Sequence, residues 1–240
     1  MEFRLDMHVH SRRSPDGLMT LSEIAERARE AGLHGVAVCD HDRVFPEDQP
    51  LDAFPGLLII PGVEVSTDIG HLLGWFVTRP VKARTFPEAV AEIHAQGGVA
   101  VLAHPFEHTV RPERAETASK YVDGVEVWNS RAERKNRRAN AMAAAFASTR
   151  NLRGFAGSDA HTPREIGNGV TIIRADALTP EAVKAALLSG EVRTEGRGSK
   201  AVWTAVSQRE RLRKSNAGPL SYCKWAAFAV KCALEDLFRP

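Results

Sequence analysis

Asp6, His8 and His10 alternate along the apolar run LDMHVHS near the start of the chain. If this run is a β-strand, the three side chains project from one face, because residues two apart in a strand share a face. Imidazole nitrogens and carboxylate oxygens placed together can bind a metal ion or hydrogen-bond one another. The HxH pattern by itself leaves both interpretations open.

The same residue types recur where later apolar runs begin or end, and six of the nine histidines occupy such positions. The metal-capable residues there are His8, His10, His41, Glu64, His71, His104, Asp159 and His161. In a barrel of parallel strands the strand ends converge on one mouth, so we expect these side chains to meet. Divalent metal ions would offset the cost of burying them together. Nitrogen and oxygen ligands without thiolate suit zinc, manganese or iron, and the sequence does not choose among them.

Apolar runs alternate with helix-like segments over most of the chain, a pattern typical of strands covered by helices. Thr20 and Glu23 form a capping box that predicts the start of the first helix, and Gly32 predicts its end. The expected strands are 3–9, 35–39, 57–60, 71–77, 99–103, 123–128, 153–157 and 169–173, and the expected helices are 21–32, 86–96, 132–148 and 180–189.

Composition limits the class of protein. The chain has 240 residues, 43% of them hydrophobic and 26% charged, which suits one large domain or one domain with an appendage. A net charge of +2 favours neither nucleic acid nor an anionic membrane. The start does not resemble a signal peptide and no apolar run is long enough to span a bilayer, so we expect a cytoplasmic protein with no membrane partner. Cys39, Cys223 and Cys232 show no CxxC spacing, which fits a reducing compartment.

The pattern changes near residue 196, where EGRGSK is followed by a short charged run. We therefore predict a domain over residues 1–195 and a C-terminal helical extension over residues 196–240 with a helix from Pro219. Trp225, Phe228 and Cys232 would form an apolar stripe on that helix. This stripe could dock on the barrel or on a partner chain.

Seven ordered motifs resemble the PHP family of metal-dependent phosphoesterases, named for polymerase and histidinol phosphatase domains. They are LDMHVHSRRSPDG, VCDHD, PGVEVS, GHLLG, LAHPF, GVEVWN and GSDAHTPREIG. The resemblance covers about residues 1–195. It implies an α/β fold, a distorted (β/α)7 barrel, with two or three divalent metal ions.

The resemblance also implies how the ligands divide among the ions. The implied sets are His8, His10, Glu64 and Asp159 for the first ion, Glu64, His71 and His104 for the second, and Asp16, His41 and His161 for the third. Glu64 is then the bridging ligand. Asp16 stands where members with three ions have a histidine or an aspartate, so two and three ions both stay open.

The implied reaction is hydrolysis of a phosphate ester by attack of metal-activated hydroxide on phosphorus. We expect a small phosphorylated metabolite or nucleotide as substrate, with Glu64, Asp159 and His161 as catalytic residues. Arg164 follows the SDAH motif and is the expected phosphate-binding residue, because a guanidinium offers paired donors to phosphate oxygens.

Neighbouring polar residues have expected supporting roles. Asp6, Asp40 and Asp42 would accept hydrogen bonds from ligand histidines and orient them, while Glu126 and Asn129 would line the mouth without binding metal. The histidines outside the strand-end pattern, expected to lie at the surface or in ordinary hydrogen bonds, are His34, His94 and His108.

Two alternatives remain at this stage. The basic runs 130–147 and 209–214 could attract a polyanion, which would make the chain a 5′-end exonuclease on short RNA or DNA oligonucleotides. The barrel could also be a non-catalytic metal-binding module whose tail, residues 205–240, docks a partner. The intact ligand set counts against the second alternative.

Overall fold

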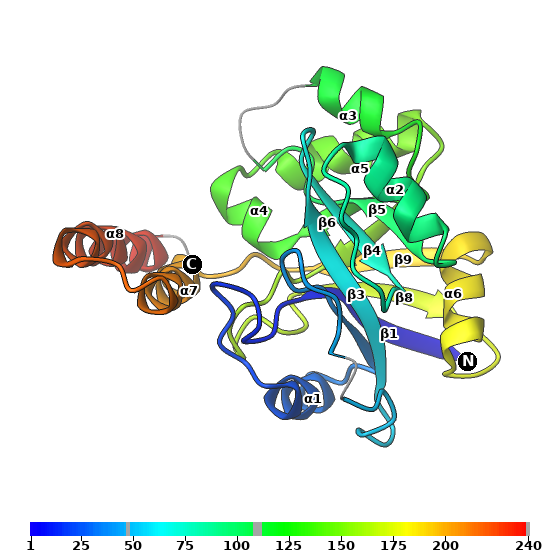
Figure 1. Cartoon of the computed structure of the whole chain (residues 1–240), viewed down its shortest axis with the longest axis horizontal. Helices are drawn as coiled ribbons and strands as arrows, with labels where there is room; N and C mark the ends of the chain where they lie inside the picture. Colours follow the sequence, from blue (N-terminus) through cyan, green and yellow to red (C-terminus); the bar gives the residue numbers. More distant parts are fainter. Residues whose placement is uncertain (47–48, 108–111, 239–240) are drawn as a thin grey trace.

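Nine strands of the described chain form one mixed sheet in the order β7-β6-β5-β4-β3-β2-β1-β8-β9. The computed structural model describes residues 1–46, 49–107 and 112–238 (Figure 1). The strands are β1 (Glu2–Val9), β2 (Gly35–Val38), β3 (Leu58–Ser66), β4 (His71–Trp75), β5 (Val99–Leu102), β6 (Gly124–Asn129), β7 (Arg153–Gly157), β8 (Gly169–Arg174) and β9 (Val192–Gly196).

The sheet curls until its two ends nearly meet. Strand β7, at one end of the order, lies against β8 and β9 at the other. The Thr171 hydroxyl accepts a hydrogen bond from the Ala156 N–H at 2.8 Å and donates one to the Ala156 carbonyl at 2.9 Å. These bonds join β8 to β7 across the seam, so the sheet is a nearly closed barrel and the α/β barrel class is confirmed.

The helices up to residue 189 lie around this sheet, whereas the last two helices lie to one side of it and pack on each other (Figure 1). They are α1 (Leu21–Glu30), α2 (Phe86–His94), α3 (Pro112–Ala118), α4 (Ser130–Lys135), α5 (Ala139–Thr149), α6 (Pro180–Ser189), α7 (Ala201–Lys214) and α8 (Pro219–Phe238). The predicted capping box is present: Thr20 accepts from the Glu23 N–H, and the Glu23 carboxylate accepts from the Thr20 N–H.

Strand direction differs from the expected all-parallel pattern. The pairs β1–β8, β3–β4, β4–β5 and β8–β9 are antiparallel. Only residues 67–70 connect β3 to β4, and so short a connection cannot cross back for parallel pairing. Strand β4 therefore starts at the same end of the barrel where β3 finishes, with Ser66 opposite His71.

Strand β1 is buried on both faces. Leu5 and Met7 pack in an apolar cluster with Trp75 and Phe155, and the Trp75 indole donates to the Met7 carbonyl at 3.0 Å. The opposite face carries the polar residues, and His8 is fully buried there. Burying polar side chains in this way is stable only if they have partners.

The C-terminal extension forms two helices that pack on each other. Cys232 lies in a small cluster with Ala201 and Ala205 of α7, and the Trp225 indole donates to the Ala205 carbonyl at 2.7 Å. The Asp236 carboxylate accepts from the first two N–H groups of α7 at 2.7 and 2.9 Å. The predicted helical extension is confirmed, and its apolar stripe docks on α7. No helix in the described part of the chain is both long and apolar enough to cross a membrane.

Candidate metal centre

Four side chains meet at the end of the barrel where β1, β3 and β7 finish. The His8 and His10 Nε2 atoms lie 3.1 Å apart, and both lie 3.3–3.5 Å from Glu64 Oε2. Asp159 Oδ1 lies 3.3 Å from His10 Nε2 and 3.8 Å from His8 Nε2. Ligands about 2.0–2.2 Å from a tetrahedral metal ion are themselves about 3.3–3.6 Å apart, so this spacing fits an ion.

Orphaned polar atoms support the same conclusion. Glu64 Oε2, His71 Nδ1 and Asp16 Oδ1 are buried and have no hydrogen-bond partner among the described residues. Yet His71 Nδ1 lies 2.7 Å from Glu64 Oε1, and Asp16 Oδ1 lies 3.2 Å from His161 Nε2. Nitrogen and oxygen atoms that lie this close without forming a hydrogen bond keep their lone pairs free, and a cation between them could accept those lone pairs. The residues present therefore fit divalent metal ions.

Glu64 lies between the groups of imidazoles. Its Oε1 faces His71 at 2.7 Å and His104 at 3.0 Å, while Oε2 lies 2.9 Å from His41 Nδ1 and near His8. Burial alone would raise the pKa of Glu64, but the surrounding imidazoles hold it well below its ordinary value. One carboxylate with both oxygens engaged in this way has the geometry of a bridging ligand.

A third group lies beside the first. His10, His41 and His161 bring ring nitrogens within 4.8 Å of one another, and Asp16 lies 3.9 Å from His41. His41 also approaches Glu64, so it lies between the second and third predicted sets. The structure thus brings all nine predicted ligands into one region.

Glu126 orients His8, a role that sequence reasoning did not assign to it. Its Oε1 lies 2.9 Å from His8 Nδ1, which leaves Nε2 facing the other candidate ligands. Its Oε2 accepts from the His104 backbone N–H at 2.9 Å and from the Asn129 amide at 3.0 Å. A carboxylate on the far nitrogen fixes the tautomer and ring orientation of a ligand histidine. Both residues are buried, and neither is among the residues that line the cavities described below, so their predicted place at the mouth stays a prediction.

The three aspartates expected to orient histidines behave differently. Asp6 accepts backbone N–H groups from the loop after β7, and burial raises its pKa to about 6. Asp42 accepts from the end of β3. Asp40 reaches His10 only through Ser14, whose hydroxyl lies 2.9 Å from both Asp40 Oδ1 and His10 Nδ1. The prediction is wrong for Asp6 and Asp42, because their carboxylates are used to hold loops.

Backbone strain is concentrated at the same place. His104 has φ 23° and Asp159 has φ 55°, in the left-handed region that non-glycine residues rarely adopt. Both are predicted ligands that lie two positions after the end of a strand. Strained conformations persist where surrounding contacts enforce them, and they cluster at functional sites.

Seven of the nine candidate ligands line a cavity of 360 Å³, whereas His8 and His10 are fully buried and lie outside its lining. Its cationic lining residues are Arg131, Lys135 and Arg211, the last from α7. Arg164 is exposed and lies outside this lining, so its role in phosphate binding stays a prediction. The sequence motifs did not indicate Arg131, Lys135 and Arg211 as cavity residues, because only the folding of the chain brings them to the mouth of the barrel.

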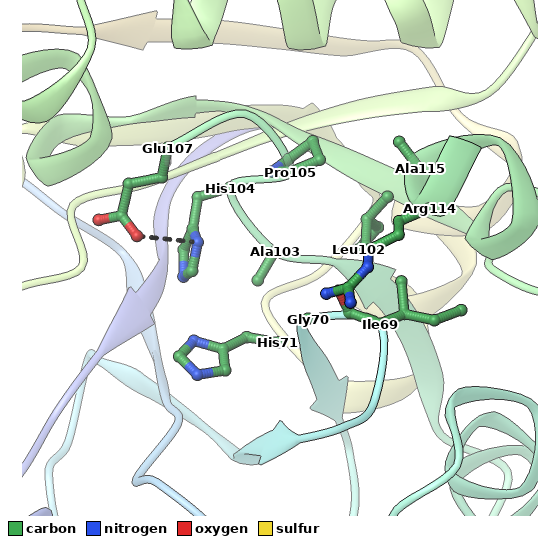
Figure 2. Close-up of a pocket in the computed structure, with 10 residues that line it drawn as sticks. All are labelled: Ile69, Gly70, His71, Leu102, Ala103, His104, Pro105, Glu107, Arg114 and Ala115. Carbon is green, nitrogen blue, oxygen red and sulfur yellow. Dashed lines mark hydrogen bonds and ion pairs between the residues drawn. The ribbon is translucent and has the colours of Figure 1, made fainter. Parts of the chain in front are cut away.

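A second cavity, of 470 Å³, adjoins the first and shares His71, His104 and Glu107 with it (Figure 2). The remaining histidines lie elsewhere. His34 accepts from a backbone N–H at 3.0 Å, and His94 pairs with an aspartate at 2.9 Å, as expected of ordinary hydrogen-bonded histidines. His108 lies outside the described residues.

Comparisons with known proteins show which family the chain matches. The PHP domain model matches residues 6–155, and a PHP-associated model matches residues 137–192. An uncharacterized protein of Methanocaldococcus jannaschii is 29% identical over 197 residues, covering 74% of this chain and 76% of that one. A 5′-3′ exoribonuclease of Haemophilus influenzae is 37% identical over 70 residues, only 28% of this chain and 25% of its own length.

One solved structure shares the fold over most of the chain. It is a two-domain protein of Bacteroides vulgatus that contains a predicted PHP-like metal-dependent phosphoesterase. The TM-score is 0.67 at 20% identity, over 89% of this chain and 70% of that one. Identity at this level shows the likeness of the folds and nothing finer.

Proposed function

This chain belongs to the PHP domain family, and from that premise we propose that it is a metal-dependent phosphoesterase acting on a small phosphorylated metabolite or nucleotide. The observation that carries the proposal is the position of Glu64 among imidazoles from four separate segments, with one buried oxygen left without a hydrogen bond. Two or three divalent ions, whether zinc, manganese or iron, are the cofactors that suit this donor set.

Bound divalent ions would lower the pKa of a coordinated water and neutralise charge on the phosphate oxygens. The chain's own task is to hold its donors in place and to orient the substrate. Glu64 and Asp159 would hold the ions, and His161 would present Nε2 to the cavity, because its Nδ1 is 2.8 Å from the Asp159 carbonyl. Arg211 of α7 lines the same cavity and would attract the phosphate group.

A 5′-end exonuclease is the second candidate, and similarity to the Haemophilus influenzae exoribonuclease favours it. Some cations of the basic run that would bind an oligonucleotide already form ion pairs with carboxylates of the same chain. Lys135 pairs with Glu107, and Arg134 lies 3.8 Å from Glu235. Cations already paired contribute less to a polyanion site, so we favour a small substrate.

A non-catalytic module with a docking tail has less support. The apolar stripe of the tail packs on α7 within the same chain. The candidate ligands are also complete. The division into two domains near residue 196 stays a prediction. Strand β9 ends at Gly196, and α7 and α8 follow it.

The test is release of inorganic phosphate from sugar phosphates, nucleotides and 5′-phosphorylated oligonucleotides with Mn²⁺ added. We expect turnover by the wild-type chain, and its loss by about a hundredfold or more in His8→Ala, because one ligand and its orienting contact are removed. His94→Ala is the matched control, since His94 lies outside the centre. Equal turnover by wild type and His8→Ala would defeat the proposal, and activity confined to oligonucleotides would favour the exonuclease.

A further inference from the structure

The cavity in Figure 2 adjoins the candidate ligands, and part of its lining is apolar. His71 and His104 stand at one end of its lining. The rest of its lining combines an apolar side with Gly70, Glu107 and Arg114, and the apolar side is made by Ile69, Leu102, Ala103, Pro105 and Ala115. A substrate phosphate held near the two histidines would therefore have its organic group beside an apolar surface.

The wall is built by three segments that the fold holds in place. Leu102, at the end of β5, and Ala115, on α3, are 2% and 4% exposed. Ile69 lies in the turn between β3 and β4, where the Thr67 hydroxyl accepts from the Ile69 N–H at 3.3 Å. The cavity is thus formed by buried and hydrogen-bonded residues, as small-molecule sites usually are.

Arg114 is the cation of this cavity. Figure 2 shows its side chain reaching from α3 toward Ile69, with His71 and His104 across the open space. Its guanidinium donates to the Ile69 carbonyl at 3.5 Å and forms no ion pair within the described chain. A guanidinium placed this way can lie flat on an aromatic ring.

We propose that this cavity receives the leaving group of the phosphoester and that this group carries a flat apolar ring, as a nucleoside does. The inference rests on the proposed function and narrows its substrate class. A ring would displace water from the apolar wall and stack on Arg114, whereas a small polyol would leave that wall hydrated. The volume of 470 Å³ suits a group of nucleoside size.

The test compares adenosine 5′-monophosphate with glycerol 3-phosphate in wild type, Ile69→Ala and Arg114→Ala. We expect each variant to lose about tenfold in kcat/KM for the nucleotide and less than about twofold for glycerol 3-phosphate, because only the ring contacts the altered wall. Leu188→Ala is the matched control, since Leu188 is a partly exposed aliphatic residue on α6. It should change neither value.

Equal losses on both substrates, or no loss on the nucleotide, would overturn the inference. Adding a 5′-phosphorylated dinucleotide as a third substrate shows whether the enzyme acts on a free nucleotide or on the end of an oligonucleotide. A selective loss of kcat/KM in the two variants, on the mononucleotide or on the dinucleotide, supports a ring in the cavity. Calorimetric binding of adenosine 5′-monophosphate without added metal separates this inference from the proposed function. Binding weakened by Ile69→Ala, in a chain that hydrolyses nothing, would sustain the cavity site and sink only the enzymatic proposal.

An independent observation concerns the end of α7. The Lys214 ammonium donates to the carbonyls of Arg12, Ser14 and Gly17 at 2.7, 2.8 and 2.8 Å. All three of its donors are therefore used on one loop. This loop carries Asp16, and α7 lies beyond both segments matched by the family models.

We infer that Lys214 is a positioning residue for the Asp16 side of the metal centre. The same loop supplies the Ser14 hydroxyl that lies 2.9 Å from His10 Nδ1, so its conformation affects two candidate ligands. Without Lys214, the three carbonyl oxygens would hydrogen-bond to solvent instead, and the loop would sample other conformations. Metal affinity would fall even though no ligand is altered.

The test is calorimetric titration of the full chain with Mn²⁺. Lys214→Met should weaken binding of the weakest ion by about tenfold or remove it from the stoichiometry, the scale typical of a residue that supports a ligand. Lys214→Arg should restore part of the affinity. Arg213→Ala is the control on the same helix, because Arg213 is exposed and pairs with Glu210.

Unchanged Mn²⁺ stoichiometry and affinity in Lys214→Met would overturn this inference, as would a lower melting temperature with unchanged affinity. A wild-type chain that binds no Mn²⁺ would instead defeat the metal centre itself. The two failures are therefore distinguishable.

Discussion

Replacing Glu64 with glutamine is expected to lower phosphoester hydrolysis by about a thousandfold or more and to weaken Mn²⁺ binding at more than one ion. Glutamine keeps the shape of the side chain but removes its charge and turns one acceptor into a donor. Both Glu64 oxygens face imidazole nitrogens, at 2.7 Å from His71 and 2.9 Å from His41. An amide N–H placed there would oppose a cation directly.

The measurements are phosphate release and Mn²⁺ stoichiometry for purified Glu64→Gln. The control is Glu181→Gln, an exposed carboxylate in the first turn of α6. It should match wild type in both assays. A Glu64→Gln variant that binds the same number of Mn²⁺ ions with wild-type affinity would show that Glu64 does not bridge.

Most of the candidate ligands could be picked out from the sequence because their signal is local. A ligand at a strand end is marked by the apolar run beside it, as His8 is by β1 and Asp159 by β7. The partner that orients a ligand carries no such mark. Glu126 lies 118 positions from His8 in sequence, and only the packing of β6 beside the mouth brings their side chains to 2.9 Å. Alternation along β1 pointed to Asp6, whose carboxylate holds the loop after β7.

Strand β3 shows how tertiary context overrides local signals. The apolar run 57–60 predicted a strand that ends before Pro61 and Gly62, residue types that usually interrupt strands. The strand continues to Ser66, with Pro61 opposite Val38 of β2. At Gly62 a Cβ atom would come within 2.9 Å of Cys39 Sγ, so close packing needs glycine there. This requirement is invisible without the neighbouring strand.

Helix α7 was not predicted as a helix, because its charged sequence lacks an apolar face of regular period. Its start is stabilised by Asp236, which lies 35 positions from Ala201 in sequence. Its end is fixed by contacts of Lys214 with a loop about 200 positions away. Both supports depend on the finished fold, so the sequence alone could indicate the extension but not its contacts with the loop that carries Asp16.

Replacing Arg131 with methionine is expected to lower the free energy of unfolding by about 3–5 kcal/mol. The Arg131 guanidinium is buried and donates to both oxygens of Glu165, at 2.8 and 2.7 Å, and to the Ser207 hydroxyl at 3.1 Å. Methionine would fill much of the volume but leave the buried Glu165 carboxylate without its cation. An unpaired buried charge is far more costly than a lost exposed pair.

Urea unfolding measures this effect, and Arg193→Met supplies the matched control. Arg193 pairs with Glu2 at an exposed position, so its loss should cost about 1 kcal/mol or less. Adding Glu165→Gln to Arg131→Met should recover part of the stability, because the unpaired charge is then removed. Losses of similar size in Arg131→Met and Arg193→Met would contradict the prediction.

The ion pair between Arg131 and Glu165 also connects stability to the candidate metal centre. Glu165 also accepts the His161 and Thr162 N–H groups, at 3.2 and 3.1 Å, so it anchors the loop that presents His161. Ser207 joins Arg131 to α7. The activity of Arg131→Met should therefore fall by more than the loss of folded protein accounts for, and it should stay below the wild-type value even where the variant is fully folded. Activity that follows the folded fraction alone would mean that the loop holds its conformation without this ion pair.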